Sequence, residues 1–317
     1  MHRLRLAIFA SAVLLQFLGS ARAQELSFAS AKEAQSILSA RDDFVERMSA
    51  FDRAARLKTD RDISEPQFLR FAGSATLDWT PHEKQVVEAA FLEIRTEVVR
   101  LALPLPTRIH VIKTSGQEEG NAAYTRQDAI ILPKSMLASD SYELKKIIAH
   151  ELFHISSRAN PRLANALYES IGFRYCGEVS FPASLVPRKI TNPDAPKNDH
   201  CIRVTLGGQD AWVVPILFSR SPKYDISKGG DFFEYLKLAL ALVELPENNA
   251  PSQVLADARG GPRLVELQQV SRFFDQVGYN TDYVIHPEEI LADNFALLAL
   301  RERNVRSPAT INGVSLD

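Results

Sequence analysis

One short motif, H-E-x-x-H, constrains this 317-residue chain more than any other feature of its sequence. The motif comprises His150, Glu151 and His154. On an α-helix, side chains four residues apart lie on one face, about 5–6 Å apart at Cβ, so both imidazoles can reach one metal ion. The glutamate then lies beside the ion, where it can take a proton from water. The motif therefore predicts a metal site if this segment is helical.

The segment 141–158 has the pattern of a helix. Asp140 and Glu143 have the form of a capping box at its start. Its apolar residues recur at spacings of three and four, the period of an amphipathic helix: Leu144, Ile147, Ile148, Leu152 and Ile155. The alternative is that His150 and His154 are ordinary, partly buried histidines.

The first 23 residues have the pattern of a secretory signal peptide. Arg3 and Arg5 are positive, residues 6–18 are almost wholly apolar, and residues 21–23 have the A-x-A form of a cleavage site. The apolar run is too short for a comfortable membrane span, and no later stretch approaches the required length. We therefore expect a mature chain that begins near Gln24, is exported to the periplasm or secreted, and has no membrane span.

The composition is that of an ordinary globular protein. The chain is 45% hydrophobic and 24% charged, with a formal net charge of −2. So small a net charge gives no electrostatic case for binding nucleic acid or an anionic membrane. The length of the mature chain suggests one large domain or two small ones.

The chain has two cysteines, Cys176 and Cys201. In an oxidising compartment an even pair is more often bridged than free, so we expect a disulfide. It would close a proline-rich loop and contribute about 3 kcal/mol to stability. A role as zinc ligands is less favoured, because their separation matches no usual cysteine spacing.

The remaining pattern predicts an α+β fold, because no regular βαβ repeat is present. Helices are expected at residues 30–57, 81–101, 161–170, 264–277 and from 287 onward. Strands are expected at 107–114 and 122–132, with a hairpin of 202–206 and 211–218 and, less clearly, a strand at 232–245. Pro215 within the hairpin implies an edge strand or a bulge.

A second acidic segment lies far downstream of the motif. A catalytic zinc usually has three protein ligands and one position for water. In residues 285–295, Glu289 and Asp293 are one helical turn apart and form E-x-x-x-D. The metzincin pattern is excluded, because Ser157 and Asn160 stand where it requires glycine and histidine.

Together, H-E-x-x-H and E-x-x-x-D resemble the gluzincin metallopeptidases, the thermolysin-like group. The resemblance implies that Glu289 is the third ligand of one zinc ion and that Asp293 accepts a hydrogen bond from His150. Glu288 fits less well, because the residue four positions on is Ala292.

The alternative reading of this segment is helix capping. Acidic residues in the first turn of a helix favour its dipole, so Glu288 and Glu289 after Pro287 could serve only that purpose. However, Asp293 four residues beyond Glu289 is a like-charge pair, which costs a little on a bare helix. A cation and a histidine between the two carboxylates would turn that cost into binding.

The resemblance also extends to a possible substrate-binding strand. Asn121, Ala122 and Tyr124 fit the N-A-x-aromatic pattern of the edge strand that holds extended substrate in thermolysin-like enzymes. An edge strand can pair with a peptide backbone. The alternative is that Asn121 is only a turn residue.

The resemblance covers residues 107–158 and 285–295. It implies a zincin-like fold: a small mixed or antiparallel sheet whose edge strand lies beside the motif helix. We therefore divide the mature chain into a helical N-terminal extension, 24–79, and a metallopeptidase domain, 80–317, with an insertion at 176–262. The long separation between motif and third ligand departs from the thermolysin-like pattern, so substrate specificity is not carried over.

The resemblance implies hydrolysis by metal-activated water. Glu151 would take a proton from that water and pass it to the leaving amine. A further donor should stabilise the oxyanion, and His286 and Tyr283 precede the ligand helix as candidates. The alternatives are a position at the helix start for His286 and ordinary packing for Tyr283.

These observations favour an exported zinc metallopeptidase with a peptide or protein substrate. One alternative is a zinc hydrolase of another amide, such as one in the cell wall. Another is a non-catalytic binding or scaffold protein with a structural zinc. The last predicts a closed coordination sphere, with His286 or a second carboxylate in the place of the water.

Overall fold

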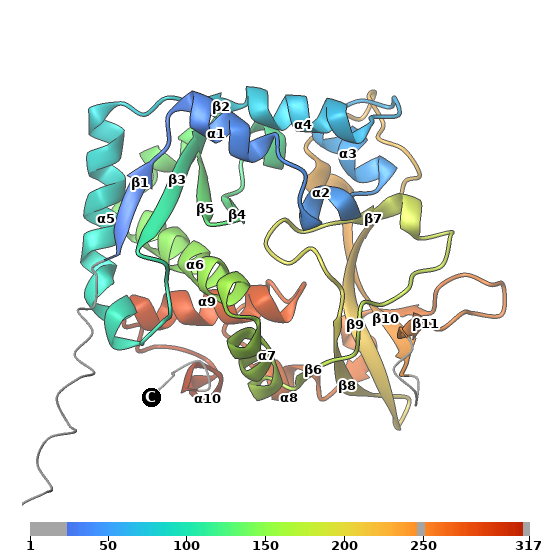
Figure 1. Cartoon of the computed structure of the whole chain (residues 1–317). Helices are drawn as coiled ribbons and strands as arrows, with labels where there is room; N and C mark the ends of the chain where they lie inside the picture. The colour runs from blue at the N-terminus through green and yellow to red at the C-terminus, as the bar shows by residue number, and fades with distance from the viewer. Residues whose placement is uncertain (1–23, 246–250, 313–317) are drawn as a thin grey trace, which may run out of the picture.

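The computed structural model describes residues 24–245 and 251–312. The predicted signal peptide lies outside this range. Within it, no helix combines the length and the apolar character needed to cross a membrane. The described residues form two β-sheets and a set of helices that pack against both (Figure 1).

The first sheet, sheet A, is mixed. Its strand order is β1 (Glu25–Phe28), β3 (Arg108–Thr114), β5 (Ala129–Pro133), β4 (Tyr124–Arg126), and β2 (Thr76–Leu77) also pairs with β3. Strands β1, β3 and β5 are parallel, whereas β4 is antiparallel to β5 and ends the sheet. The predicted strands at 107–114 and 122–132 are therefore present, the latter as a pair.

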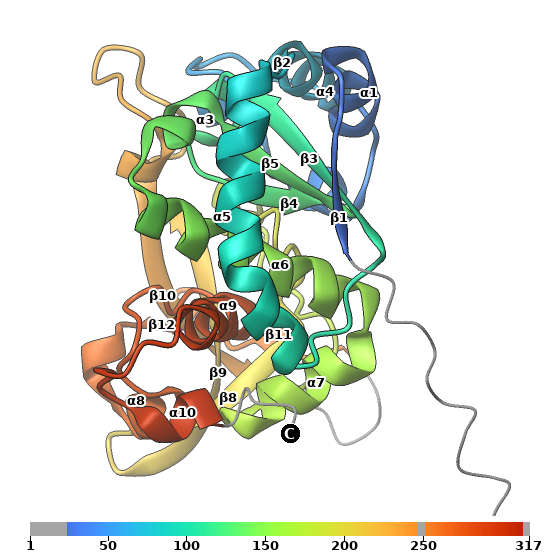
Figure 2. The same ribbon diagram turned by 90° about the vertical axis from the view of Figure 1, so that its left-hand side faces the viewer.

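The two faces of sheet A follow the alternation of side chains along its strands. Val111 and Ile130 point into a core shared with α5 (Pro81–Arg100) and α6 (Ser141–Ala159). Ile112 and Ile131 point into a second core with the N-terminal helices. Figure 2 shows α5 in front of the sheet and the N-terminal helices above it. This layering positions the helix of the motif against sheet A.

The N-terminal segment is a layer of short helices. The helix expected at 30–57 is divided into α1 (Ala31–Leu38), α2 (Asp43–Arg47) and α3 (Ala50–Arg56), and α4 (Glu65–Ser74) follows. The breaks have a local cause, because Asp42 and Ser49 each accept a hydrogen bond from the backbone three residues on and so start a new helix. The segment also supplies β1 and β2 to sheet A.

The second sheet, sheet B, is antiparallel and occupies the region expected to be an insertion. Its order is β11 (Gln253–Val254), β10 (Leu236–Glu244), β9 (Gln209–Ser219), β8 (His200–Leu206), β13 (Val270–Ser271). Three short strands join its sides: β6 (Phe173–Tyr175) on β8, β7 (Lys189–Ile190) on β9, and β12 (Leu264–Val265) on β10. The predicted hairpin and the strand at 232–245 are present, the latter after a 3-10 turn at Phe232–Tyr235.

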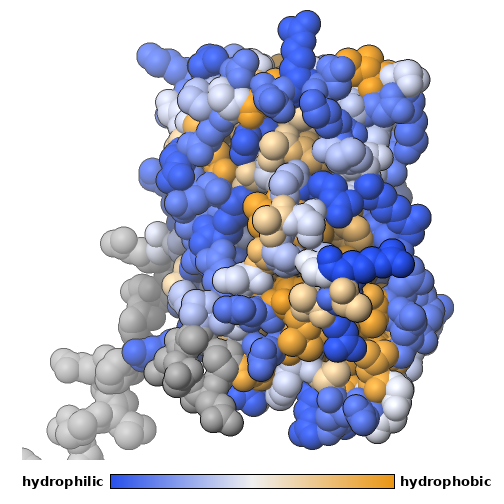
Figure 3. All heavy atoms as spheres, turned by 90° about the vertical axis from the view of Figure 1, so that its right-hand side faces the viewer, coloured by the Kyte–Doolittle hydropathy of each residue, from blue (hydrophilic) through white to orange (hydrophobic). Residues whose placement is uncertain are grey.

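One face of sheet B joins the central core and the other has a core of its own. Val213 packs in the central core, and Val214 packs in the outer one. Partly buried apolar side chains border the outer core: Phe181, Trp212, Val254 and Leu264. Seen from this side of the molecule, apolar surface gathers in the lower half and is bordered by polar side chains (Figure 3).

Pro215 does not mark an edge strand. It lies in β9, which pairs with β10 at Leu240 and has β7 and β8 on its other side. The oxygen of Pro215 accepts a hydrogen bond of 3.2 Å from Nδ2 of Asn198, which fills the gap between β7 and β8. In an antiparallel strand the backbone N and C=O of one residue point to the same side. The nitrogen of Pro215 therefore also faces this gap, and its lack of an N–H removes no hydrogen bond from the β9–β10 ladder.

The prediction of a helix at 264–277 is wrong for most of that range. The segment forms β12, a 3-10 turn at Leu267–Gln269, β13, and only then the short helix α8 (Phe273–Val277). Pairing with β10 and β8 stabilises the extended form, and such tertiary pairing outweighs a local helical period. The other predicted helices are present as α7 (Pro161–Ser170) and α9 (Pro287–Ala299), and α10 (Pro308–Asn312) follows.

The cysteines are neighbours but are not bridged. Cys201 pairs with Arg174 in the β6–β8 ladder, and the N–H of Cys176 donates to the oxygen of Asp199 at 2.8 Å. Both residues are free thiols in the structure, so the predicted disulfide is absent from it. A hydrogen bond between the thiols lowers the pKa of Cys176 and raises that of Cys201.

Candidate metal centre

The motif lies on α6, which packs closely against α9. The carboxylate of Asp140 caps α6 by accepting hydrogen bonds from the N–H groups of Tyr142 and Glu143. His150 and His154 lie one turn apart, with ring centroids 4.7 Å apart in an edge-to-face arrangement. Both therefore project from the same side of α6, as the sequence predicts.

Three possible ligand atoms converge between the two helices. Nε2 of His150 lies 3.0 Å from Oε2 of Glu289, and Nε2 of His154 lies 3.6 Å from the same oxygen. A tetrahedral zinc with ligands about 2.0–2.1 Å away holds its ligand atoms roughly 3.3 Å apart. The observed distances bracket that value. The structure thus brings together the three residues that the sequence predicts as ligands.

Carboxylates hold the far nitrogens of both histidines. Nδ1 of His150 donates to Oδ1 of Asp293 at 2.9 Å, which is the contact expected from the sequence. Asp293 in turn accepts from Thr281. Nδ1 of His154 donates to Oε1 of Glu288 at 2.8 Å. A carboxylate can only accept, so it favours the proton on Nδ1, and a bound cation could then take the lone pair of each Nε2 in place of a second proton.

The role of Glu288 is a correction to the sequence analysis, which gave it no part in the site. Ser157 and Tyr168 both donate hydrogen bonds to its carboxylate. The residue as a whole is 2% exposed. Glu288 therefore accepts three hydrogen bonds in a buried position and orients His154. Glu288 has Ala292 and not an aspartate four residues on, so it does not fit the E-x-x-x-D pattern. Only its position next to Glu289 placed it near the site in the sequence.

Unpaired atoms mark the centre of the cluster. Nε2 of His154 and Oε2 of Glu151 are buried and have no hydrogen-bond partner among the described residues. Burying a ring nitrogen without a hydrogen-bond partner costs free energy unless an ion or a water molecule binds to it. The donor set of two imidazoles and one carboxylate suits zinc, so the residues present fit such an ion.

The electrostatics of the centre also favour a cation. Burial disfavours the charged form of His150, but hydrogen bonds to Asp293 and Glu289 outweigh it and raise its pKa to about 10. Burial raises the pKa of Glu151 to about 8, and the negative charge of Asp194 adds to this effect. Without a metal, protons are thus held where several carboxylates crowd together.

The loop between β7 and β8, residues 191–199, lies over the centre and was missed by the sequence analysis. Nδ2 of Asn192 donates to Oε1 of Glu289 at 2.5 Å. Carboxylate oxygens of Asp194 and Glu151 and a ring nitrogen of His154 all lie within 4.8 Å of one another. No motif spacing links this loop to the site, and an acidic residue between Pro193 and Pro196 was its only sequence signal.

His286 is not directed at the centre, so its predicted role as oxyanion donor is wrong. Its Nδ1 accepts from the N–H of Glu288, which makes it the N-cap of α9. Its Nε2 donates to the oxygen of Lys197 at 3.2 Å. Burial lowers its pKa to about 4, so the ring is neutral.

Tyr283 precedes the N-cap of α9, and its backbone N–H donates to the hydroxyl of Thr281 at 2.9 Å. Its side chain is partly accessible, with the residue 44% exposed. Desolvation and the negative charges of Glu289 and Asp194 raise its pKa well above the usual value. The hydroxyl therefore keeps its proton at neutral pH and can donate a hydrogen bond.

The predicted substrate-binding residues divide into a turn and a strand. Asn121 has a positive φ of 65° and its N–H donates to the oxygen of Gly116, so it is a turn residue. Ala122 continues that turn by donating to the oxygen of Glu119. Tyr124 belongs to β4, but its side chain is 2% exposed and packs in the core. Only the backbone of the edge strand β4 faces outward near α6.

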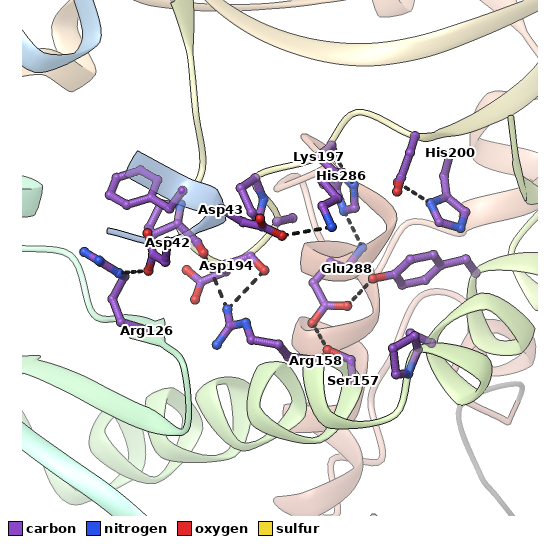
Figure 4. A pocket seen from close by; sticks show the side chains of 18 of the residues that line it. Asp42, Asp43, Arg126, Ser157, Arg158, Asp194, Lys197, His200, His286 and Glu288 are labelled. Atoms are coloured by element: carbon purple, nitrogen blue, oxygen red, sulfur yellow. Dashed lines mark hydrogen bonds and ion pairs between the residues drawn. The ribbon is translucent and has the colours of Figure 1, made fainter. Parts of the chain in front are cut away.

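A cavity of about 380 Å³ lies beside the centre. It is lined by the end of α6, by one side of α7, by the start of α9, by the β7–β8 loop and by α2. Figure 4 shows Glu288 pointing toward Ser157, and Arg158 directed at the part of the loop that carries Asp194. Nη2 of Arg158 donates to the backbone carbonyl oxygen of Asp194 at 3.3 Å.

Comparison of this chain with known protein families, with curated proteins and with solved structures found no match.

Proposed function

We propose that this chain is an exported zinc metallopeptidase of the gluzincin type. His150, His154 and Glu289 would hold one Zn²⁺ ion, and Glu151 would act as general base. The observation that carries the proposal is the convergence of His150 Nε2, His154 Nε2 and Glu289 Oε2, with both Nδ1 atoms held by carboxylates.

A coincidental cluster would not need these outer contacts. Asp293 and Glu288 each orient one imidazole, and such partners raise the basicity of a metal ligand. An ordinary buried histidine needs partners for both nitrogens, yet Nε2 of His154 has none among the described residues. The pattern supports a ligand role for both histidines.

The architecture supports a zincin-like fold. Sheet A is mixed, its last strand β4 is antiparallel to β5, and β4 contacts α6. An extended peptide could pair with the outward backbone of β4 and lie across the motif helix. This arrangement favours a peptide substrate. The proposed export rests on the first 23 residues, which have the form of a signal peptide.

The chemistry would follow from the position of Glu151. When bound, zinc lowers the pKa of water from 15.7 to about 7 and polarises a carbonyl oxygen. Glu151 is 3% exposed and lies beside His154, so it can take the proton of the attacking water and return it to the leaving amine. Tyr283 is the remaining candidate to donate a hydrogen bond to the developing oxyanion.

A structural zinc is the second candidate function. It is favoured by Asp194, a second carboxylate beside His154. In that case the ion would be enclosed by protein ligands and the chain would be a binding or scaffold protein.

Metal content tests the proposed site. We expect stoichiometric zinc in the purified chain and its loss in Glu289→Ala, measured by elemental analysis after dialysis. Glu93→Ala is the matched control, because Glu93 lies on the surface of α5 with its side chain 56% exposed. Full zinc content in Glu289→Ala would contradict the proposal.

A further inference from the structure

We propose that Asn192 is a positioning residue of the metal centre and that it restricts the carboxylate of Glu289 to one ligand oxygen. The inference rests on the proposed function and deepens it. A carboxylate can bind a zinc ion through one oxygen or through both, and a second oxygen would crowd the position that a hydrolytic site keeps for water. A residue that holds the second oxygen elsewhere therefore helps to keep that position available.

The two oxygens of Glu289 face different partners. Oε2 lies 3.0 Å from Nε2 of His150 and 3.6 Å from Nε2 of His154. Oε1 instead accepts a hydrogen bond of 2.5 Å from Nδ2 of Asn192. Glu289 is 1% exposed, so this amide takes the place of the water that would solvate Oε1 at a surface. A hydrogen bond to a carboxylate is stronger than one between neutral groups, and it holds Oε1 on the side of Asn192.

The orientation of the Asn192 amide follows from its second hydrogen bond. Oδ1 of Asn192 accepts from the backbone N–H of Asp194 at 3.1 Å. An ionised carboxylate can only accept, so the amide group that contacts Glu289 must be the NH2. Turning the amide over would therefore break both hydrogen bonds at once. The position requires a side chain that donates toward Glu289 and accepts from the loop.

The backbone on both sides of Asn192 is held by distant elements. Before it, the N–H of Thr191 donates to Oδ2 of Asp52 in α3 at 2.9 Å. After it, Oδ1 of Asp194 accepts from both the N–H and the hydroxyl of Thr125 in β4 at 2.6 Å. The N-terminal layer and sheet A thus fix the amide of Asn192 in place, which is the outer support that a precise metal site requires.

The absorption of a cobalt-loaded protein tests the proposal. The unaltered chain, Asn192→Ala and Asn198→Ala are loaded with Co²⁺, and the visible spectrum of each is recorded before and during titration with azide. Asn198 is the matched control, because it lies in the same loop and its Nδ2 donates to the backbone oxygen of Pro215 on sheet B. Its removal also costs the loop an amide hydrogen bond but leaves Glu289 with its partner.

In Asn192→Ala, Oε1 of Glu289 is free to turn toward the ion and add a ligand atom. Four-coordinate Co²⁺ absorbs visible light more strongly than five-coordinate Co²⁺, so coordination geometry can be followed from the spectrum. We therefore expect a loss of visible absorption in Asn192→Ala, and a smaller spectral response to azide, because less room is left for an added ligand. Asn198→Ala should match the unaltered chain in both measurements.

Equal absorption and equal azide responses in Asn192→Ala and the unaltered chain would overturn the proposal while leaving the proposed metal site intact. Failure of the unaltered chain to bind Co²⁺ or Zn²⁺ would overturn both. If Asn192→Ala does not fold, Asn192→Leu takes its place, because leucine keeps the volume of the side chain without a donor, and the same spectral outcomes decide.

Discussion

Glu288 and Glu289, adjacent on α9, contact opposite nitrogens of the same histidine. Oε1 of Glu288 lies 2.8 Å from Nδ1 of His154, and Oε2 of Glu289 lies 3.6 Å from Nε2. Adjacent helical residues point in different directions, so the ring lies between the two side chains. One glutamate would bind the metal while its neighbour fixes the orientation of the ring.

This relationship predicts the effect of removing Glu288. In Glu288→Ala, Nδ1 of His154 loses its acceptor, so the ring is no longer held with Nε2 toward the ion. We expect zinc affinity to fall about 10–100-fold, measured by competition with a chelator. Glu93→Ala should bind zinc as the unaltered chain does. Unchanged affinity in Glu288→Ala would show that Glu288 acts only in packing with Tyr168 and Ser157.

Glu151 is predicted to act in turnover and not in metal binding. Glu151→Gln should keep its zinc, while hydrolysis of a fluorogenic peptide mixture should fall by about 10²–10⁴-fold, since proton transfer to this carboxylate is lost. Glu143→Gln, at the exposed start of α6, is the control. Persistent hydrolysis in Glu151→Gln that a chelator abolishes would remove Glu151 from the mechanism.

The pKa of His150 predicts how the metal-free protein responds to pH. This pKa is raised from 6.5 to about 10 in the fold. The proton on His150 therefore stabilises the folded state fully below pH 6.5, and this contribution is lost as the pH rises through 10. In urea unfolding with a chelator present, the unaltered chain should lose more stability between pH 6.5 and 9.5 than His150→Gln does. Parallel losses would contradict the shift. Saturating zinc should remove the difference, because the bound metal replaces the proton.

A buried charge network is predicted to be important for stability. Arg56 pairs with Asp52 and, at 2.6 Å, with Glu119, and its guanidinium also donates to the oxygen of Thr191 at 3.3 Å. Arg56→Met leaves two buried carboxylates unpaired and should cost about 3–5 kcal/mol in chemical denaturation. Arg41→Met is the control, because this side chain is 55% exposed and its loss should cost less than about 1 kcal/mol. Similar losses in the two variants would mean that the network is not coupled to folding.

If the chain is exported as proposed, the two cysteines are predicted to form a bridge. Their thiols are already hydrogen-bonded to each other, so oxidation requires little movement. Mass spectrometry of the secreted, unreduced chain should show the loss of two hydrogens, and reductant should lower its stability by about 3 kcal/mol. Cys176→Ser should be insensitive to reductant. Two free thiols in the secreted chain would contradict the prediction.

The sequence predicted those parts of the site that have a fixed spacing. His150, Glu151 and His154 follow from the period of a helix, and Glu289 and Asp293 repeat one such turn on α9. The pairing of the two helices could be proposed only from a family resemblance. The distances between the side chains of α6 and α9 could be obtained only from the three-dimensional structure.

Other parts depend on contacts that no local pattern encodes. Asn192 and Asp194 reach the centre because β7 and β8 hold the loop there, and these strands pair with distant segments. His286 looked like a catalytic residue because it precedes the ligand helix, but its nitrogens are used by the backbone of Glu288 and Lys197. The two short strands β12 and β13 likewise depend on partners in β10 and β8.

The attachment of the β7–β8 loop at both ends has a kinetic consequence. Ile190 is paired with Leu217 just before the loop, and His200 is paired with Tyr175 just after it. The loop can therefore lift only as a flap whose two hinges stay on sheet B. Asp194 would remain tethered close to Glu151 and His154, at a high effective concentration. Reclosure would then be a first-order process, with a rate independent of how dilute the protein is.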